Sequence, residues 1–319
     1  MKVTKNMVHE DLRGMYWLLK STSFLLSQVW LIKLMNKLSA RSNGANILEL
    51  HCEEKYIPSW HGGPNIRVRI FKPLNITGEL PGMLYIHGGG YVTGSPESAF
   101  DIVKNFINAK PCVVIAPAYR NALEAPYPAA LNDCYDTLLW LKENAQTIGV
   151  IPDKFIIGGH SAGGGLTAAV ALKATDTQDV YIAFQMPIYP MIDDRQITES
   201  ASSDAPVWNA KTNKLGWSLY LQDLEKQNIA IPAYAAPARA TDYSKLPPTI
   251  TFVGDMEPFR DETIEYVENL KRAGVPVAFE MYQGCYHGFD LVVPKAEISK
   301  SAWHFLLKTY GNFVDKYFP

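Results

Sequence analysis

The chain has 319 residues, of which 47% are hydrophobic and 19% charged, a composition typical of a globular protein large enough to bury a sizeable core. Lysine and arginine number 30 against 32 aspartates and glutamates, which gives a formal net charge of -2. This balance, without a run of interleaved basic and aromatic residues, argues against a nucleic-acid partner.

The N-terminal segment is apolar without being a membrane span. Residues 15–32 are interrupted by Lys20 and Gln28, and a span needs roughly 20 apolar residues. Glu10 and Asp11 stand where a secretory leader carries basic residues. The four cysteines have no Cys-x-x-Cys spacing, so no zinc ribbon or dithiol redox motif is predicted. We expect a cytoplasmic protein with reduced thiols, no metal and no cofactor.

The first half of the chain predicts helices and then a sheet. Residues 1 to about 50 have helical spacing with large apolar side chains, including Trp17 and Trp30. Residues 66–71 alternate polar and apolar side chains, as an antiparallel edge strand does. Short apolar runs then alternate with amphipathic stretches. The runs are 83–86, 112–116, 155–157, 181–186, 249–253 and 277–281, and the helical stretches are 129–145, 162–173, 261–273 and 297–316.

Such alternation predicts an α/β fold with a mostly parallel sheet covered by helices on both faces. A second segment, about 192–242, also departs from it and contains Trp208 and Trp217. We interpret 1–319 as one domain, with a helical cap from about 1–50 and about 192–242 over a core of about 51–191 and 243–319. Ordinary peripheral helices are an equally good interpretation of the two segments.

A candidate nucleophile lies where a predicted strand meets a predicted helix. Gly159-His160-Ser161-Ala162-Gly163 has the G-x-S-x-G form of a nucleophile elbow, which exposes a serine oxygen at a sharp turn. The glycines allow the helix to approach the strand closely. A serine hydroxyl is a weak nucleophile at neutral pH, so it needs a base within hydrogen-bond reach and a carboxylate to orient that base.

The best candidate base is His287, in a glycine-flanked loop after the last predicted strand. Such a loop opens at the carboxyl end of the sheet, where Ser161 is also expected. His304 falls inside the terminal helix, where packing or solvation explains it. His9 and His51 have no comparable context, and His160 is the variable residue of the elbow.

Four carboxylates follow the strand at 249–253. Asp261 and Glu262 begin a helix, where the positive end of the macrodipole is a sufficient explanation for acidic residues. Asp255 and Glu257 therefore remain as alternatives for the acid. The order serine, acid, histidine is that of α/β-hydrolases.

Acyl transfer also needs N–H donors for an oxyanion, one from the residue after the nucleophile and others from the loop after the third strand. Ala162 supplies the first, and the glycine loop at 86–91 exposes further N–H groups. A second His-Gly-Gly at 61–63 precedes Pro64 and the alternating strand, so a hairpin turn accounts for it.

Over roughly residues 60–319 the chain resembles the hormone-sensitive-lipase-like esterases, or bacterial family IV carboxylesterases. The motifs that carry the resemblance are His87-Gly-Gly-Gly-Tyr91, Tyr127-Pro-Ala-Ala130, Gly159-His-Ser-Ala-Gly-Gly164, Leu246-Pro-Pro248, Glu257-Pro-Phe-Arg-Asp-Glu262, Ala273-Gly-Val275 and His287-Gly-Phe289. The resemblance implies an α/β-hydrolase fold with a helical cap, hydrolysis of carboxylic esters, and an oxyanion hole formed by the N–H groups of Gly88, Gly89 and Ala162.

Two positions depart from the family pattern. His160 replaces the aspartate of G-D-S-A-G, but that residue is not a triad member. Glu257 replaces the aspartate of D-P-L-R-D-E, and a glutamate can accept the same hydrogen bond from the imidazole. The resemblance therefore favours Glu257 as the acid, with Asp255 as the alternative.

The substrate is predicted only by class. Tyr91, Trp208 and Trp217 are expected to line the substrate pocket, and short or medium acyl chains are favoured because the sequence indicates no exposed lipid-binding surface. The alternatives are a deacetylase or amidase with the same triad and a non-catalytic hydrolase-fold binding protein. A nucleotide-dependent reductase lacks support because neither G-x-G-x-x-G nor G-K-[ST] occurs. A homo-oligomer is compatible with the sequence.

Overall fold

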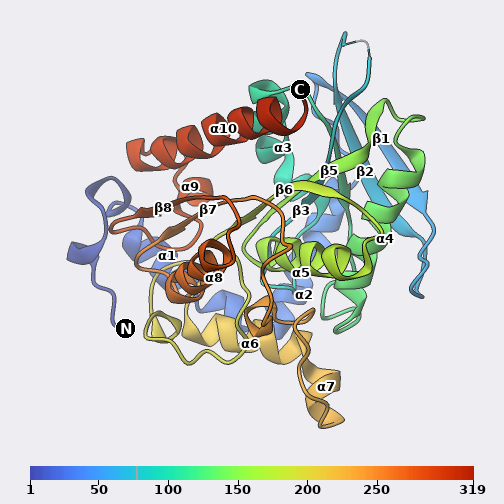
Figure 1. The fold of residues 1–319 in the computed structure, drawn as a ribbon. Coiled ribbons are helices and arrows are strands. Elements are labelled where there is room, and N and C mark those ends of the chain that lie inside the picture. Colours follow the sequence, from blue (N-terminus) through green and yellow to red (C-terminus); the bar gives the residue numbers. More distant parts are fainter. Residues whose placement is uncertain (77) are drawn as a thin grey trace.

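The computed structural model describes residues 1–76 and 78–319, and its centre is one eight-stranded sheet with the order β1-β2-β4-β3-β5-β6-β7-β8 (Figure 1). β2 is antiparallel to both of its neighbours, and the other pairs are parallel. The predicted α/β fold with a mostly parallel sheet is confirmed. The strands are β1 (Leu50–Ile57), β2 (Ile66–Pro73), β3 (Leu80–Ile86), β4 (Val113–Pro117), β5 (Val150–His160), β6 (Ile182–Ile188), β7 (Thr249–Gly254) and β8 (Val277–Tyr282).

Helices cover both faces of this sheet because its central strands are apolar on both sides. In β3, Leu84 and Ile86 join the core cluster on one face, and Met83 and Tyr85 join the cluster on the other. Figure 1 shows α3 and α10 together on one side, with α5 and α8 on the other. The core helices are α3 (Phe100–Ala109), α4 (Ala129–Asn144), α5 (Ala162–Thr177), α8 (Arg260–Arg272), α9 (Phe289–Val292) and α10 (Glu297–Tyr317), with a 3₁₀ turn η5 (Pro96–Ala99) before α3.

The edge of the sheet differs from the prediction. β2 is antiparallel as expected, but it is not the edge strand, because β1 pairs with it along its full length from Leu50 opposite Pro73 to Ile57 opposite Ile66. β1 was missed because most of its side chains are polar and at least partly exposed. The His-Gly-Gly at 61–63 lies in the connection between β1 and β2, as the hairpin interpretation predicts.

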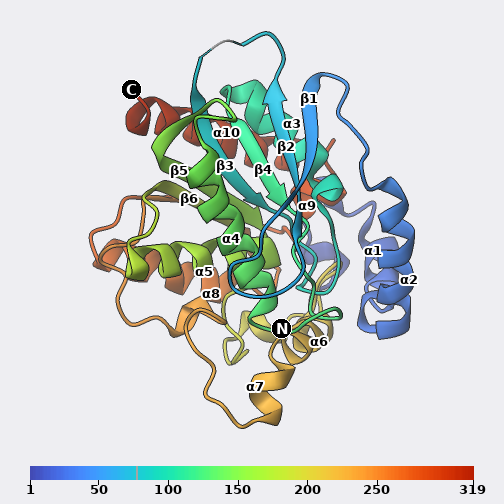
Figure 2. The same ribbon diagram turned by 90° about the vertical axis from the view of Figure 1, so that its right-hand side faces the viewer.

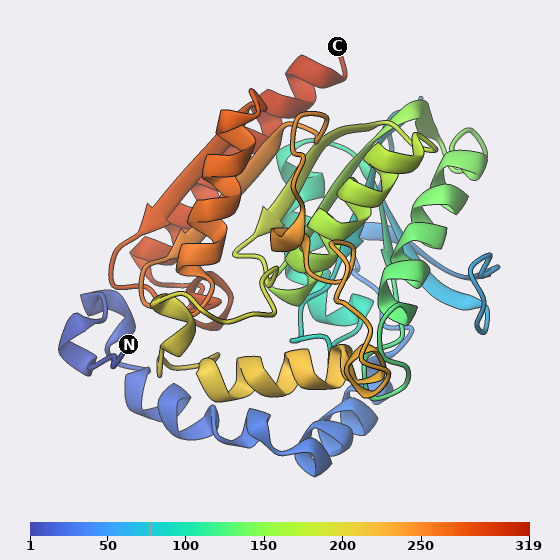
Figure 3. The same ribbon diagram turned by 60° about the horizontal axis from the view of Figure 1, so that its bottom comes forward.

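The two segments outside the alternation lie against each other at one end of the molecule (Figure 3). Val3 N–H donates to Asp204 Oδ1 (2.6 Å), and Lys20 pairs with Asp204 Oδ2 (3.2 Å). The packing supports the proposed cap. The first segment contains η1 (Lys5–Met7), η2 (Glu10–Leu12), α1 (Tyr16–Thr22), η3 (Leu25–Ser27), α2 (Val29–Ser39) and η4 (Ala40–Ser42), and the second contains η6 (Ser200–Ser202), α6 (Ala210–Tyr220), α7 (Gln222–Lys226) and η7 (Pro237–Arg239).

The outer side of α1, η3 and α2 carries exposed apolar side chains, contrary to the expectation that no such surface exists. Figure 2 shows these two helices standing at the edge of the molecule, away from the sheet. The exposed side chains are Trp17, Leu18, Phe24, Leu25, Trp30, Leu34, Met35 and Leu38. Within the described part of the chain, no helix has the length and apolar character needed to cross a membrane.

Candidate active site

Ser161 lies at the sharp turn between β5 and α5, in the strand-turn-helix setting that the sequence predicts. Its backbone has φ 59° and ψ -122°, a region that residues with side chains seldom occupy. Hydrogen bonds hold this conformation, because Ser161 N–H donates to Ile188 O (3.0 Å) and Ser161 O accepts from Gly165 N–H (2.9 Å) and Met191 N–H (3.1 Å). The surrounding backbone therefore fixes the direction of the serine side chain.

The glycines around Ser161 allow α5 to approach the end of β3. A Cβ added to Gly163 would lie 2.1 Å from Ile86 O, and one added to Gly159 would lie 2.5 Å from the same oxygen. These distances are far shorter than van der Waals contact, so the close approach requires glycine at both positions.

Gly163→Ala is therefore expected to lower the free energy of unfolding by about 1–3 kcal/mol through overpacking. Gly311→Ala is the matched control, because Gly311 lies in the interior of α10 and has room for a side chain. A Cβ added there would lie 3.6 Å from its nearest neighbour, Lys110 Cε, which is ordinary van der Waals contact. That control should raise the free energy of unfolding by up to about 1 kcal/mol, since alanine is the better helix former. Urea denaturation measures both. Equal effects of the two substitutions would contradict the close-packing explanation.

The structure brings His287 to Ser161 from the loop after β8. His287 Nε2 lies 2.8 Å from Ser161 Oγ, and Nδ1 is hydrogen-bonded to Glu257 Oε2. The rings of Phe259 and Tyr189 meet the imidazole edge-on, with centroids 5.0 and 4.9 Å away. Packing thus fixes the imidazole between a hydroxyl and a carboxylate, the arrangement that activates a serine nucleophile.

Of the two acids that the sequence left open, only Glu257 contacts the imidazole. It is completely buried, and its Oε1 accepts a hydrogen bond from Gly254 N–H (3.0 Å). Asp255 instead accepts from Gly284 N–H (2.6 Å), which fastens the loop that leads to His287. Burial raises the pKa of Asp255.

The glycine loop after β3 lies next to Ser161. A Cβ on Gly88 would lie 3.5 Å from Ser161 Cβ, and Gly89 has φ +127°. Among the residues that the structure describes, no acceptor is hydrogen-bonded to the N–H of Gly88 or Gly89. Ala162 begins α5, and the first N–H groups of a helix have no intrahelical partner. These three donors are therefore available for a ligand.

His87 shapes this loop. Its ring stacks on Tyr119 with centroids 4.2 Å apart, and Nδ1 lies 2.8 Å from Gly88 O. Tyr119 Oη donates to His87 O (3.0 Å). Burial lowers the pKa of His87 to about 4, so the ring is neutral at pH 7.

A cavity of about 430 Å³ adjoins Ser161 and His287 between the sheet and the cap. Its walls are mostly apolar, and none of the described residues that line it is Asp, Glu, Lys or Arg. Such a cavity suits a neutral, largely apolar ligand. The cavity walls include residues of the cap (Leu26, Met35, Ser39, Val207, Trp208), of α3 and the turn before it (Ser98, Ala99, Ile102) and of α9 (Leu291, Val292).

The expected pocket residues are only partly found at this cavity. Trp208 lines it, but Tyr91 and Trp217 do not and pack behind it. Tyr91 Oη donates to Met191 O (2.8 Å), and its ring stacks on Tyr220 at 4.1 Å. The expectation for Tyr91 and Trp217 is thus corrected, because the two rings pack against each other, with centroids 5.4 Å apart, in the hydrophobic core where the cap meets the sheet. Leu26 and Met35 were missed, since their apolar spacing also suits ordinary packing.

Glu262 is a second correction. In the sequence, the helix macrodipole alone explains its position at the start of α8, yet the side chain is buried and accepts hydrogen bonds from Ile192 N–H (2.8 Å) and Asp193 N–H (3.3 Å). It therefore anchors the chain where it leaves the sheet for the second cap segment. Burial raises the pKa of Glu262.

A buried polar group of side chains lies behind the imidazole of His287. Tyr85 Oη lies 2.7 Å from His160 Nδ1, and Tyr189 Oη donates to Asp290 Oδ1 (3.0 Å). Burial lowers the pKa of His160 to about 3 and raises the pKa of Asp290 to about 7. Close to neutral pH, Asp290 is therefore the group in this cluster whose charge changes.

Asp290→Asn is expected to make the free energy of unfolding less sensitive to pH. An unfolded aspartate titrates near 3.8 and the folded Asp290 near 7, so the folded protein holds the extra proton between these values. Stability of the unmodified protein is therefore lost as pH rises from about 4 to about 7, and asparagine removes this loss. Urea denaturation at pH 5 and pH 8 should show the variant gaining stability relative to the unmodified protein at the higher pH. A difference that is the same at both pH values would contradict the buried titration.

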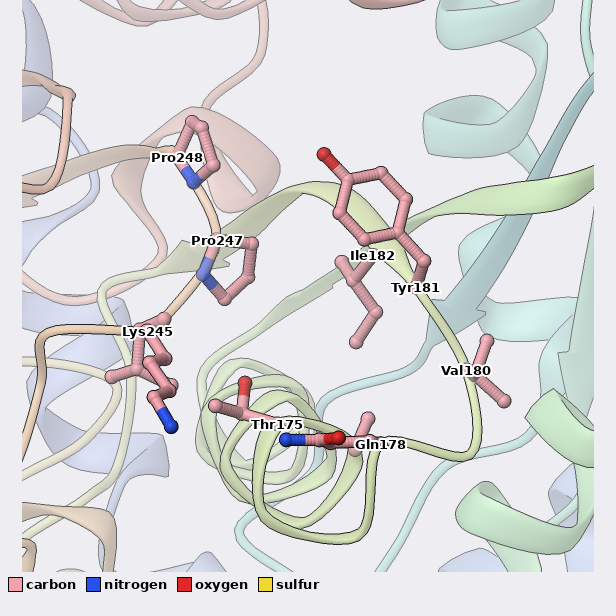
Figure 4. A pocket seen from close by; sticks show the side chains of 10 residues that line it. Thr175, Gln178, Val180, Tyr181, Ile182, Lys245, Pro247 and Pro248 are labelled. Carbon is pink, nitrogen blue, oxygen red and sulfur yellow. The ribbon is translucent and has the colours of Figure 1, made fainter.

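A second cavity, of about 370 Å³, lies at the opposite, amino-terminal ends of β6 and β7 (Figure 4). Its described lining contains no serine, cysteine or histidine, and Lys245 is its one charged side chain. It therefore holds no serine or cysteine paired with a histidine, the arrangement found in the first cavity. Within the described residues, no three His, Cys, Asp or Glu side chains are grouped to hold a metal ion.

Comparison with known proteins places this geometry among hydrolases. Residues 83–291 match the family model described as alpha/beta hydrolase fold. The chain is 32% identical over 254 residues to Carboxylesterase NlhH of Mycobacterium tuberculosis, covering 78% of this chain and 79% of the relative. It is 33% identical over 213 residues to Esterase LipI of the same species, covering 66% of each. A solved structure of a bacterial heroin esterase superposes with a TM-score of 0.86 at 31% identity, over 98% of this chain and 99% of the other.

Proposed function

The chain belongs to the hormone-sensitive-lipase-like carboxylesterases of the α/β-hydrolase fold, and from this premise we propose that Ser161, His287 and Glu257 are its catalytic triad. The enzyme hydrolyses carboxylic esters. The observation that carries the proposal is the continuous hydrogen-bonded line from Ser161 Oγ through both nitrogens of His287 to the buried carboxylate of Glu257.

In the first half of the reaction, Ser161 Oγ attacks the ester carbonyl while His287 Nε2 takes its proton. Glu257 stabilises the imidazolium and holds the ring in the required tautomer. Negative charge develops on the carbonyl oxygen, and the N–H groups of Gly88, Gly89 and Ala162 are placed to bind it. One such donor contributes about 3 kcal/mol to the transition state. His287 then gives its proton to the departing alcohol, which leaves an acyl-enzyme.

In the second half, water enters beside His287, which removes a proton from it as the oxygen attacks the acyl-enzyme. The same N–H groups bind the second oxyanion. As this intermediate collapses, the bond between the acyl carbon and Ser161 Oγ breaks, His287 gives its proton to Ser161 Oγ, and the acid is released. One base thus serves both steps, because the alcohol and the water occupy the same place in turn.

We propose that the preferred substrates carry short or medium acyl chains. The cavity of about 430 Å³ is near the small end of the range for ligand pockets, roughly 300–1,000 Å³. Its uncharged lining favours esters that are neutral in both the acyl and the alcohol part.

A series of p-nitrophenyl esters from acetate to palmitate tests this preference. The value of kcat/KM should rise over the first additions of CH₂, each of which contributes up to about 0.8 kcal/mol when buried. It should then fall once the acyl chain outgrows the cavity. A maximum at the longest esters would overturn the assignment of substrate size and would leave the triad untouched.

A further inference from the structure

Exposed apolar side chains are concentrated in α1, η3, α2 and the turn between the two helices, and we call this set the cap face. It consists of Trp17, Leu18, Phe24, Leu25, Trp30, Leu34, Met35 and Leu38. Trp17, Phe24 and Trp30 are 67%, 63% and 66% exposed. Single exposed apolar residues are ordinary, but eight within 22 consecutive positions, 17–38, make a patch of the kind that marks an interaction site.

Basic side chains accompany the cap face, and acidic ones are absent from its sequence. Residues 12–48 contain five lysines and arginines and no aspartate or glutamate. In α2 and the turn after it, Lys33, Lys37 and Arg41 recur every four residues, beside the exposed stripe of Trp30, Leu34 and Leu38 with the same spacing. Within residues 1–76 and 78–319, these three basic side chains form no ion pair.

We propose that the cap face docks the enzyme on an anionic lipid surface, with α2 lying in the plane of that surface. An amphipathic helix with tryptophan and leucine on one side and lysine along its flank is the arrangement that binds at the boundary between headgroups and acyl chains. The basic side chains add attraction to anionic headgroups, and burial of the aromatic rings supplies the apolar contribution.

The same cap segment forms a wall of the active-site cavity. Met35 is exposed on the cap face and also lines the cavity, and Leu26 and Ser39 line it from neighbouring turns. α2 is tied to the glycine loop, because Asn36 Nδ2 donates to Val92 O (2.9 Å). A lipid surface against the cap face would therefore lie next to the cavity, so that apolar esters dissolved in the lipid could enter it. This last step rests on the proposed function.

A second copy of the chain is a poorer occupant of the cap face. A symmetric dimer places the same patch of both copies together, and the patch would then bring lysines and arginines against lysines and arginines. With no acidic side chain in residues 12–48 to balance them, such a contact is electrostatically unfavourable. An anionic lipid layer has the opposite charge to these lysines and arginines, and it can also bury the apolar side chains of the cap face.

Flotation of the full-length protein with vesicles tests the proposal. Vesicles of phosphatidylcholine and phosphatidylglycerol in equal parts should bind the protein, and vesicles of phosphatidylcholine alone should bind it at least about tenfold more weakly. The Trp30→Ser/Leu34→Ser and Lys33→Glu/Lys37→Glu double variants should each reduce the partition coefficient by about tenfold or more. The control is Tyr181→Ser. Tyr181 is an aromatic residue that is 65% exposed just before the amino-terminal end of β6, so this variant should bind like the unmodified protein.

The variants should hydrolyse a water-soluble ester at the unmodified rate, because none of the four substituted positions lines the cavity. Failure of the unmodified protein to bind anionic vesicles would overturn the proposal. So would a dimer in lipid-free solution that Trp30→Ser/Leu34→Ser converts to monomer. Ser161→Ala should bind vesicles like the unmodified protein. Vesicle binding therefore tests the docking proposal, and the activity of Ser161→Ala tests the triad, so that either can fail without the other.

Discussion

Ser161→Ala is expected to reduce kcat for ester hydrolysis by about 10⁴-fold or more, because alanine removes the atom that forms the acyl-enzyme. The fold should be unaffected, since His287 Nε2 is the only hydrogen-bond partner of the serine hydroxyl among the described residues. Steady-state kinetics on a p-nitrophenyl ester in the preferred size range measures the loss. Activity near that of the unmodified enzyme would contradict the assignment of Ser161.

His287→Ala and the double variant Ser161→Ala/His287→Ala sharpen this test. Side chains that act as one unit are strongly non-additive, so both should lose about as much activity as Ser161→Ala alone. Ser98→Ala is the matched control, because Ser98 lines the same cavity but its hydroxyl donates to Ser95 O (2.6 Å). It should retain kcat within a few-fold. Additive losses in the double variant would indicate that the two residues act independently.

Glu257→Gln is expected to lower kcat by about 10²–10⁴-fold, because an amide cannot stabilise the imidazolium and favours the wrong tautomer of His287. The Glu257 side chain is completely buried and also accepts a hydrogen bond from Gly254 N–H. Glutamine can keep this second hydrogen bond through its amide oxygen. Kinetics on the same ester, with the fold checked by circular dichroism, measures the effect.

Asp255→Asn provides the comparison for Glu257→Gln. Asp255 accepts from Gly284 N–H rather than from His287, so its loss should change kcat by less than about tenfold through a looser loop. The reverse ranking of the two variants, with Asp255→Asn the more damaging, would move the acid to Asp255 and would contradict the role given to Glu257.

The groups that we propose as the reaction centre were predictable because each lies beside a local sequence signal. Ser161 is marked by glycines between a strand and a helix, and Gly88 and Gly89 by a glycine loop after a strand. His287 follows the last strand, and parallel strands bring such loops to one edge. Local spacing alone could not choose between Glu257 and Asp255, because both follow β7 within three residues. Their difference is one of side-chain direction, which only tertiary packing decides.

The parts that were not predicted depend on contacts distant in sequence. β1 is a strand because it pairs with β2, although its residues are polar. Glu262 is buried because the second cap segment covers it. Tyr91, Trp208 and Trp217 are all buried aromatic side chains, yet of the three only Trp208 lines the cavity beside Ser161. The exposed face of α2 has the periodicity of an ordinary buried helix, so its exposure could not be inferred from spacing.

Labelling with a fluorophosphonate probe tests the central claim most directly, because such a probe reacts with a serine only when a base activates it within an oxyanion site. The unmodified enzyme should take up one probe per chain, and peptide mass spectrometry should locate the adduct on Ser161, with parallel loss of esterase activity. Ser161→Ala and His287→Ala should remain unlabelled. Loss of activity with the adduct on another residue, or full activity after Ser161 has been labelled, would contradict the account.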